Sequence, residues 1–329
     1  MPRPLKRVLV TAGTLHPAAV ARLMAAGLEV EFMAGAVDET ALLRAAGMGP
    51  LHAIVLRGNP PVTRRLIAAA PDLVIIAKHG AGVDSVDLAA AGAAGIIVAT
   101  AGDTGAAAVA ELTLAMMLAL RRNLLPFTER IRAGHWDRGG FLGQELGGQT
   151  LGIVGLGRIG TRVAGMARML GMNVLALRRD DRSFRDVEAV SLDMLLARAD
   201  IVTLHCPLTE ATRRIIDAAA IARMRRGAML INTARGPLVD EAAIAAALRS
   251  GHLAGAAFDV FGREPLGDDD PLRTAPNVVL TPHIGSQTAA ALQRTAMQVA
   301  DNVLAALSGQ TIPAELIAAS ASSQNEVIQ

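Results

Sequence analysis

The sequence contains few of the residues on which several classes of protein depend. Among 329 residues there is no tyrosine, and there is one tryptophan. Cys206 is the only cysteine, which excludes an intrachain disulfide and a metal site built on several cysteines. Its apolar neighbours favour a buried, inert thiol over a nucleophile. Four histidines have no partner at metal-ligand spacing, so we expect no metal site; they are His16, His52, His135 and His252.

Long apolar runs are also missing. No stretch reaches the roughly 18–20 apolar residues that a helix needs to cross a bilayer. The first residues lack the apolar core and the cleavage site of a secretory signal. We therefore expect a cytoplasmic protein that has no membrane partner.

A large excess of one charge is absent as well. Basic residues number 32 and acidic residues 30, which gives a net charge of +2, although the isoelectric point is about 9.3. With no tyrosine, and lysine only at Lys6 and Lys78, few groups titrate between histidine and arginine. A small positive excess therefore raises the isoelectric point strongly. The basic residues are scattered among acidic ones, so we expect no nucleic-acid partner.

What is present is an alternation of short apolar runs with alanine-rich helical segments. This pattern is typical of α/β proteins whose parallel sheets are covered by helices. The length predicts two domains. Strands are expected in a first series and in a second series of six, which suits a dinucleotide-binding domain: Arg7–Thr11, Leu28–Met33, Ala53–Leu56, Leu73–Ala77 and Ile96–Ala99, then Leu151–Val154, Asn173–Leu177, Ile201–His205, Ala228–Asn232, Gly255–Asp259 and Asn277–Thr281.

Three further segments complete the expected organisation. Apolar residues fill most positions of a long helix predicted at about Gly105–Arg122. An irregular stretch is expected over Asn123–Gln149, and a helix from Thr288 to about Leu307. Ala318–Gln329 is small and polar, and we expect it to be disordered.

The strongest single motif is a glycine loop after the strand Leu151–Val154. It reads Gly155-Leu156-Gly157-Arg158-Ile159-Gly160 and opens a helical pattern. Gly155 permits a tight turn, Gly157 lets the backbone approach a pyrophosphate, and Gly160 permits close packing of helix on strand. The helix N-terminus adds amides and a positive dipole. Its place between a strand and a helix predicts a dinucleotide site.

The end of the next strand bears on the choice of cofactor. A carboxylate there would bind the ribose 2′-hydroxyl of NAD, whereas Arg178 and Arg179 stand at this point. Paired guanidinium groups would chelate a 2′-phosphate, so the sequence favours NADP, with NAD possible. The alternative is that both arginines are solvated and that Asp180 or Asp181 holds the ribose.

Residues that can bind an anion or transfer a proton follow three later strands. Arg235, Glu264 and His283 each come after a predicted strand of the second series. Because ligands bind at the carboxyl ends of strands in open α/β sheets, we expect these residues to share one crevice. Together they could bind a carboxylate, orient a base and move a proton.

With these motifs the chain resembles the D-isomer-specific 2-hydroxyacid dehydrogenases. Three further segments occur in the order found in that family, namely Gly80-Ala81-Gly82-Val83-Asp84, Val109-Ala110-Glu111 and His205-Cys206-Pro207-Leu208-Thr209. The resemblance implies a Rossmann-type dinucleotide-binding domain at 101–287 and a flavodoxin-like substrate domain at 1–100 and 288–329, with catalysis in the cleft between domains. It implies transfer of a hydride between NAD(P)H and a small 2-keto acid, which gives the D-2-hydroxy acid.

The same resemblance assigns roles to individual residues. Arg235 would bind the substrate carboxylate and polarise the keto oxygen, His283 would be the acid–base catalyst, and Glu264 would pair with His283. A nearby carboxylate stabilises imidazolium and fixes the histidine tautomer. Asp259 would hold the nicotinamide carboxamide. Further residues would line the cofactor, namely His205, Pro207, Thr233, Ala234 and Gly285.

The first domain would supply the other substrate contacts. The resemblance implies that the backbone of Ala81 and Gly82 grips the substrate carboxylate, as a nest of amides can. Arg57 and Lys78 resemble the substrate-side basic residues of phosphoglycerate dehydrogenases. Asn59, however, replaces a second basic residue, and the sequence ends before the additional regulatory domain that some of those enzymes carry. We therefore favour glyoxylate or hydroxypyruvate, with D-3-phosphoglycerate as the alternative.

Two expectations concern assembly. By resemblance, the helix and arm around Gly105–Gln149 would form a homodimer. Some members of the wider family are dinucleotide-binding transcriptional corepressors, and such proteins can retain the three catalytic residues. No long partner-binding extension is evident, so the enzyme is the preferred interpretation.

Overall fold

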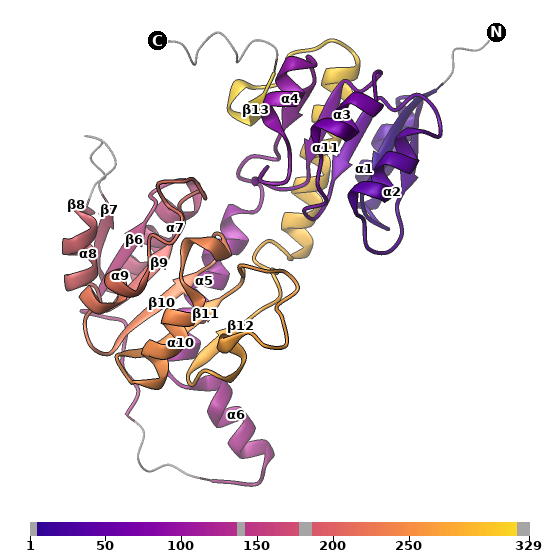
Figure 1. Ribbon diagram of the computed structural model, residues 1–329. Helices are drawn as coiled ribbons and strands as arrows, with labels where there is room; N and C mark the ends of the chain where they lie inside the picture. Colours follow the sequence, from indigo (N-terminus) through magenta and orange to yellow (C-terminus); the bar gives the residue numbers. More distant parts are fainter. Residues whose placement is uncertain (1–4, 137–141, 178–185, 321–329) are drawn as a thin grey trace. The chain divides into compact units, whose positions relative to one another are not determined.

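The computed structural model describes residues 5–136, 142–177 and 186–320. The chain divides into two compact units (Figure 1). Unit 1 comprises residues Met1–Gly105 and Gln287–Gln329, and unit 2 comprises Ala106–Ser286. None of the helices in the described ranges combines the length and apolar character that crossing a membrane requires.

Unit 1 is built on a six-stranded sheet in the order β13-β5-β4-β3-β1-β2. The strands pair in parallel except β13, which runs antiparallel to β5. The order 2-1-3-4-5 of its first five strands is the flavodoxin-like one, as predicted. The elements are β1 Lys6–Val10, α1 Pro17–Ala25, β2 Leu28–Phe32, α2 Glu39–Ala46, β3 Ala53–Leu56, α3 Arg64–Ala69, β4 Ile75–Lys78, α4 Leu88–Ala93, β5 Ile97–Ala99, α11 Ala289–Leu307, a 3-10 turn at Ala314–Leu316, and β13 Ile317–Ala319.

Unit 2 has a parallel sheet of seven described strands in the order β12-β11-β10-β9-β6-β7-β8. This is the doubly wound Rossmann order, with its switch point between β6 and β9. The elements are α5 Ala106–Arg121, α6 Leu124–Arg132, β6 Thr150–Val154, α7 Arg158–Met169, β7 Asn173–Leu177, β8 Glu188–Val190, α8 Leu192–Arg198, β9 Ile201–Leu204, α9 Ala218–Arg223, β10 Ala228–Asn232, a 3-10 turn at Gly236–Leu238, α10 Glu241–Arg249, β11 Leu253–Phe258, a 3-10 turn at Pro271–Thr274, and β12 Val278–Leu280.

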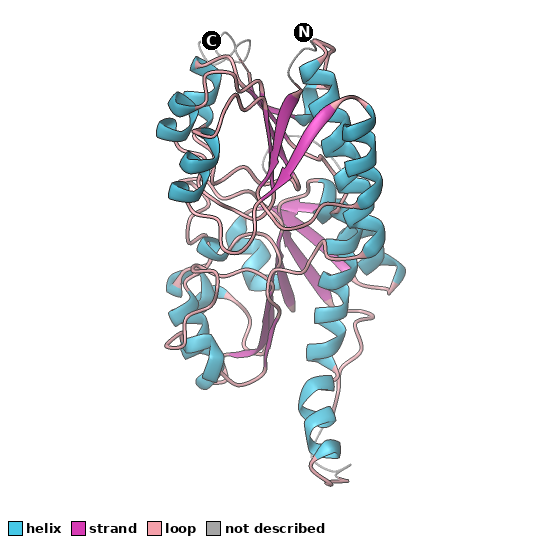
Figure 2. Cartoon of the chain, turned by 90° about the vertical axis from the view of Figure 1, so that its right-hand side faces the viewer, coloured by secondary structure: helices cyan, strands magenta, loops and turns pink. Residues whose placement is uncertain are grey.

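Both sheets are buried on two faces, and Figure 2 shows helices on either side of the strands. Strands such as β3, β9 and β10 are therefore buried throughout, which explains why their sequences are largely apolar. Helix starts are fixed by side-chain caps. Asp240, for example, accepts a hydrogen bond from the Ala243 amide at 3.0 Å and begins α10.

Three predictions about local structure were wrong. Helix α6 lies within the stretch predicted to be irregular: Pro126 is tolerated in its first turn, and Leu124, Phe127 and Ile131 recur at helical spacing. The short strand β8 was missed. Ala318 and Ala319 were expected to be disordered but pair with β5 as part of β13.

Candidate active site

The glycine loop joins β6 to α7 at the switch point of unit 2. Gly155 has a φ of +105°, and a Cβ there would lie 2.6 Å from the amide nitrogen of Cys206. A Cβ on Gly160 would lie 2.1 Å from the carbonyl oxygen of Gly155. Both positions therefore require glycine, because β6, β9 and α7 approach one another so closely.

The start of α7 fits a pyrophosphate. Its N-cap is Gly157, which has no side chain to cap the helix. No atom lies within 4 Å of the position that a Cβ of Gly157 would occupy. The first-turn amides thus face outward without a capping side chain, which is the arrangement that binds phosphate. Arg158 is exposed and Ile159 is half-buried beside them. Arg178 and Arg179, predicted to choose between NADP and NAD, lie outside the described residues.

His205 follows β9, the strand across the switch point. Its Nε2 lies 3.0 Å from the Thr203 hydroxyl, and its Nδ1 is buried without a hydrogen-bond partner in the described part of the chain. Burial lowers the pKa of His205 to about 3, so its imidazole is neutral at physiological pH. A ring nitrogen left unpaired in a site of this kind is suited to a ligand that supplies the missing partner. Pro207, two residues on, is exposed.

The low pKa of His205 predicts a pH dependence of stability. In the unfolded chain His205 is protonated below about pH 6.5, whereas in the folded chain it is protonated only below about pH 3. The free energy of unfolding therefore falls as the pH is lowered through this window. The slope from this residue is at most about 1.4 kcal/mol per pH unit. Denaturant titrations between pH 7 and 5 should show a shallower dependence in His205→Gln than in the wild type. Equal slopes would contradict the assignment.

Three adjacent parallel strands, β10, β11 and β12, deliver the other predicted residues to one edge of the sheet. After β10, the buried Asn232 fixes the turn: its Nδ2 donates to the Arg235 carbonyl at 2.8 Å, and its Oδ1 accepts from the Ala234 amide at 3.1 Å. The Thr233 hydroxyl lies 3.1 Å from that of Thr113 on α5. Arg235 is half-buried and donates to the Ala234 carbonyl at 2.7 Å.

Asp259 follows β11 and is 1% exposed. Its Oδ1 accepts from the Ile284 amide at 2.8 Å and from the Thr281 hydroxyl at 2.6 Å, and its Oδ2 accepts from the Gly285 amide at 2.7 Å. Asp259 therefore fixes the turn in which His283 has a φ of +54°. The sequence did not reveal this link. The predicted contact of Asp259 with the nicotinamide remains a prediction.

Glu264 and His283 form a hydrogen-bonded pair in which Oε2 of Glu264 lies 2.7 Å from Nδ1 of His283. The other oxygen, Oε1, accepts from the Phe261 amide at 3.1 Å. Burial would raise the pKa of Glu264, but the hydrogen bond and charge of His283, the Phe261 amide and the charge of Arg235 outweigh it and lower that pKa. The carboxylate is thus ionised at neutral pH. Because it can only accept, it fixes the Nδ1–H tautomer and leaves Nε2 for a substrate.

The side chains of His283 and Glu264 remain 43% and 33% exposed, so a small molecule can reach them. A Cβ on Gly236, the residue after Arg235, would lie 1.9 Å from the carbonyl carbon of Phe261 in the Glu264 loop, so adjoining turns of unit 2 carry the three predicted catalytic residues. Such a group can move a proton beside a bound anion.

The predicted substrate-side residues gather in unit 1 at the carboxyl ends of its strands. Arg57 lies at the switch point between β1 and β3, where its amide and carbonyl both bond the Thr11 hydroxyl at 2.9 Å. Lys78 ends β4, is 5% exposed, and bonds the Gly58 carbonyl and Oδ1 of Asn59. Ala81 and Gly82 form the turn that follows.

His79 belongs to the same cluster. Burial, followed by the charges of Arg57 and Lys78, lowers the pKa of His79 to about 4. The histidine is therefore neutral at pH 7, and the positive charge of the cluster comes from the arginine and the lysine.

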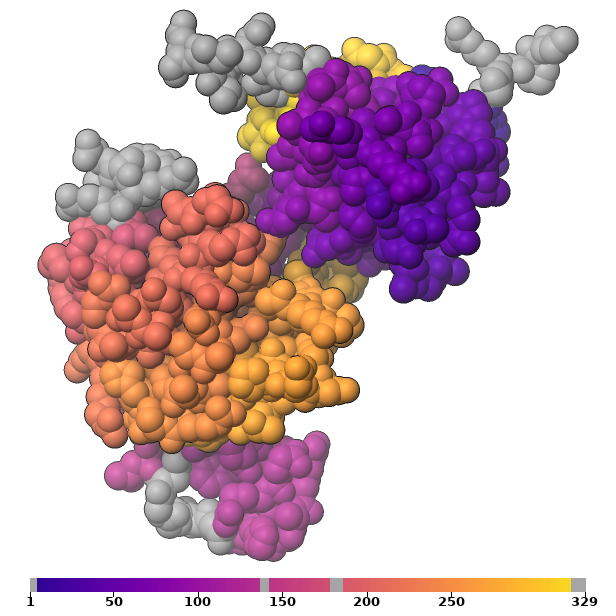
Figure 3. Space-filling model, viewed as in Figure 1, coloured from indigo at the N-terminus to yellow at the C-terminus, as the bar shows by residue number. Residues whose placement is uncertain are grey.

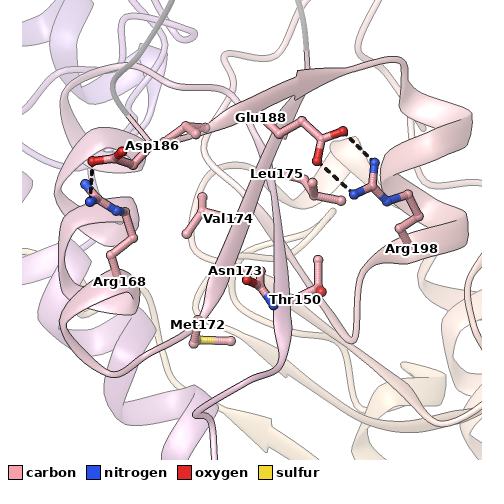
Figure 4. Close-up of a pocket in the computed structure, with 10 residues that line it drawn as sticks. Thr150, Arg168, Met172, Asn173, Val174, Leu175, Asp186, Glu188 and Arg198 are labelled. Carbon is pink, nitrogen blue, oxygen red and sulfur yellow. Dashed lines mark hydrogen bonds and ion pairs between the residues drawn. The ribbon is translucent and has the colours of Figure 1, made fainter.

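A separate cavity of about 620 Å³ lies along β7 and β8 (Figure 4). Two ion pairs flank it, Arg168–Asp186 at 2.5 Å and Arg198–Glu188 at 2.6 Å. Since each of these arginines is matched by a carboxylate and the lining contains no predicted site residue from the described parts of the chain, we do not assign the cavity to the active site.

The comparisons with known proteins agree with the geometry of unit 2. Residues 114–285 match the family model described as D-isomer specific 2-hydroxyacid dehydrogenase, NAD binding domain. The chain belongs to this family. It therefore carries the family's nicotinamide-dinucleotide-binding domain, as predicted from the glycine loop.

Relatives of known name extend the match to most of the chain. The (S)-sulfolactate dehydrogenase of Chromohalobacter salexigens is 42% identical over 84% of this chain and 91% of its own length. The D-3-phosphoglycerate dehydrogenase of Methanocaldococcus jannaschii is 40% identical over 92% of this chain but 58% of its own length. The family member described here thus spans little more than half the length of the D-3-phosphoglycerate dehydrogenases it matches first.

Solved structures of the family share the fold. The TT0316 protein of Thermus thermophilus superposes with a TM-score of 0.87 at 40% identity, covering 93% of this chain and 98% of that chain. A glyoxylate reductase described from Paecilomyes thermophila gives a TM-score of 0.84 at 31% identity, covering 94% and 98%. These matches confirm the predicted fold class.

Proposed function

We propose that this protein is an NAD(P)-dependent D-2-hydroxyacid dehydrogenase that reduces a small 2-keto acid. The observation that carries the proposal is the hydrogen-bonded pair of Glu264 and His283 at the carboxyl edge of the dinucleotide-binding sheet. The sheet offers a phosphate site at Gly157, and the pair offers a proton donor at the same edge. Membership of the family supports the same reaction.

Each of the three residues has a distinct role in this reaction. A bound nicotinamide dinucleotide supplies the hydride in reduction and accepts it in oxidation. Glu264 holds Nδ1 of His283, so that Nε2 donates the proton to the keto oxygen and takes it back in the reverse direction. Arg235 binds the substrate carboxylate and stabilises the charge that develops on the keto oxygen.

For the substrate we propose a small 2-keto acid of one of two kinds. Glyoxylate and hydroxypyruvate are the preferred candidates from the sequence, and one similar structure is a glyoxylate reductase. The cationic cluster of Arg57 and Lys78 in unit 1 favours a second candidate, a 2-keto acid that carries a further acidic group. The named relatives are dehydrogenases of 2-hydroxy acids that carry a further acidic group, phosphoglycerate and sulfolactate. We therefore keep D-3-phosphoglycerate dehydrogenase as the alternative.

One assay tests the function and ranks these candidates. Oxidation of NADPH and of NADH is followed separately with glyoxylate, hydroxypyruvate, pyruvate, phosphohydroxypyruvate and sulfopyruvate. We expect turnover with at least one of them. A folded protein that binds dinucleotide but oxidises none would argue against a small 2-keto acid and favour the corepressor interpretation, which a peptide pulldown would test.

For the cofactor we propose a preference for NADP. The support is the pair Arg178–Arg179 at the end of the second strand, where a carboxylate would favour NAD. Replacing Arg178 with aspartate should lower kcat/KM for NADPH and raise it for NADH, because the new carboxylate repels the 2′-phosphate and can bond the 2′-hydroxyl. Arg223→Ala, which removes a surface arginine paired with Asp193, is the control. An unchanged ratio would refute this interpretation.

We also propose a homodimer formed through α5 and α6. Helix α6 extends away from the sheet of unit 2 (Figures 1 and 3), and large apolar side chains of this region are more than half exposed or nearly so: Leu124, Leu125, Ile131 and Trp136. Burying such a surface against its own copy is a common solution for a protein with an exposed apolar patch. Light scattering should give about twice the 34.0 kDa of one chain.

A further inference from the structure

The loop that carries Glu264 is held by a residue outside the catalytic group. One carboxylate oxygen of Glu264 bonds His283, and the other bonds the Phe261 amide of its own loop. The position of the carboxylate relative to His283 therefore depends on what holds the loop backbone in place. The residues of this loop after Phe261 are exposed, so packing alone does not immobilise them. Another contact must define the position of Gly262–Glu264.

Glu241, the first residue of α10, supplies that contact. Its Oε1 accepts a hydrogen bond from the Gly262 amide at 2.7 Å. A Cβ on Gly262 would lie 3.1 Å from the other oxygen, Oε2, so the whole carboxylate lies against this glycine. The contact spans 21 residues of sequence and joins the helix directly to the middle of the loop.

The anchor itself is rigid. Glu241 follows Asp240, whose side chain caps α10, and the helix packs its buried residues, such as Ile244 and Leu248, into the core of unit 2. The half-buried carboxylate of Glu241 therefore extends from a fixed point. Charge-assisted bonds from an amide to a carboxylate are stronger than neutral ones, which suits a single contact that must hold a loop.

A second contact ties the same loop to the segment of Arg235. A Cβ on Gly236 would lie 1.9 Å from the carbonyl carbon of Phe261, so the two backbones touch. Gly236 directly follows Arg235 and begins the turn that leads into α10. The Arg235 turn, Glu241 and the Glu264 loop thus form one continuous unit.

We propose that Glu241 is a positioning residue: by holding the Gly262 amide it fixes Glu264, and through Glu264 it fixes the orientation of His283 for proton transfer. This inference rests on the proposed dehydrogenase function. In the described part of the chain Glu241 hydrogen-bonds Gly262 and neither member of the pair, so it acts through the loop backbone.

Two substitutions of Glu241 distinguish the effect of losing its hydrogen bond to Gly262 from the effect of losing its negative charge. Glu241→Gln keeps a carbonyl oxygen that can accept from Gly262, whereas Glu241→Ala removes the acceptor. We expect Glu241→Ala to lower kcat about 10- to 100-fold, as misplacement of a catalytic group does. The Kd for the dinucleotide should stay unchanged, because the glycine loop lies elsewhere on the sheet. Glu241→Gln should retain kcat within about threefold, the cost of the weaker neutral hydrogen bond.

The matched control is Glu39→Ala in unit 1. Glu39 is likewise the first residue of a helix, follows a capping aspartate, and accepts one hydrogen bond, from the Thr63 hydroxyl. It should lose stability without loss of kcat. A kcat of folded Glu241→Ala within twofold of the wild type, or an equal loss in Glu241→Gln, would overturn the proposal.

Hydrogen–deuterium exchange provides a readout that needs no turnover. The peptide that contains Gly262 should exchange faster in Glu241→Ala than in the wild type, and at the wild-type rate in Glu241→Gln. Unchanged exchange in Glu241→Ala would overturn the proposal by itself. If the wild type reduces no 2-keto acid but exchange behaves as expected, the dehydrogenase function fails while the hold of Glu241 on the loop stands.

Discussion

Replacing His283 with alanine should lower kcat by about 100- to 10,000-fold, the range typical for loss of one well-placed acid–base group. The Glu264 carboxylate occupies Nδ1, so Nε2 is the ring atom left to move a proton, and alanine has no substitute. The Kd for NADPH should remain close to that of the wild type, because the glycine loop and the start of α7 do not depend on His283. Steady-state kinetics and fluorescence titration with NADPH measure the two effects separately.

A histidine elsewhere in unit 2 serves as the control. The Nε2 atom of His252 lies 2.9 Å from the Ile221 carbonyl, and the residue has no place in the proposed reaction. His252→Ala should lower stability and leave kcat near the wild-type value. If His283→Ala turned over at a near-normal rate, His283 would not be the proton donor, and the central assignment of the site would be lost.

Replacing Arg235 with alanine should lower kcat/KM for the keto acid by about 100- to 1000-fold, as removal of one donor to a developing oxyanion does. Arg235→Lys should lie between the alanine variant and the wild type, since it keeps the charge but loses the paired donors that match a carboxylate. Initial rates over a range of keto-acid concentrations separate kcat from KM.

The control for Arg235 is again a charged residue of the same unit. Arg249 donates to the Pro271 carbonyl and to the Thr274 hydroxyl and lies at the end of α10. Arg249→Ala should leave kcat/KM unchanged. A loss in Arg235→Ala no larger than in Arg249→Ala would mean that the substrate carboxylate is bound by other residues.

Much of this molecule could be predicted because its signals are local. The start of α11 after Thr288 was predicted correctly because a capping residue precedes a run of helical periodicity, and the structure shows Thr288 accepting from the Ala291 amide. Apart from β8 and β13, the strands of both sheets were placed to within a few residues, because strands buried on both faces are largely apolar. The glycine loop identified its site because only glycine fits at Gly155 and Gly160.

What could not be predicted depends on contacts between distant segments or on surface that no core covers. Helix α6 has no buried residue. The spacing of Leu124, Phe127 and Ile131 is helical, but Pro126 stands among them and no side-chain cap marks the start of the helix. Glu241 reads in the sequence as an acidic residue that complements the helix dipole, and nothing local indicates a bond to Gly262. Asp259 was predicted at the end of a strand and, by resemblance, beside the nicotinamide, and neither prediction indicated that it organises the turn of His283.

The two crossings between the units have a consequence for the order in which the chain folds. Unit 2 is inserted into unit 1, yet its two ends meet, since Gly285 lies against the Val109 side chain. Once unit 2 has folded, the chain enters it after Gly105 and leaves it before Gln287 at neighbouring points. Bringing the two segments of unit 1 together then costs little loop-closure entropy, as for a short loop. During synthesis the inserted unit is complete before α11 leaves the ribosome, so the outer unit must be the last to close.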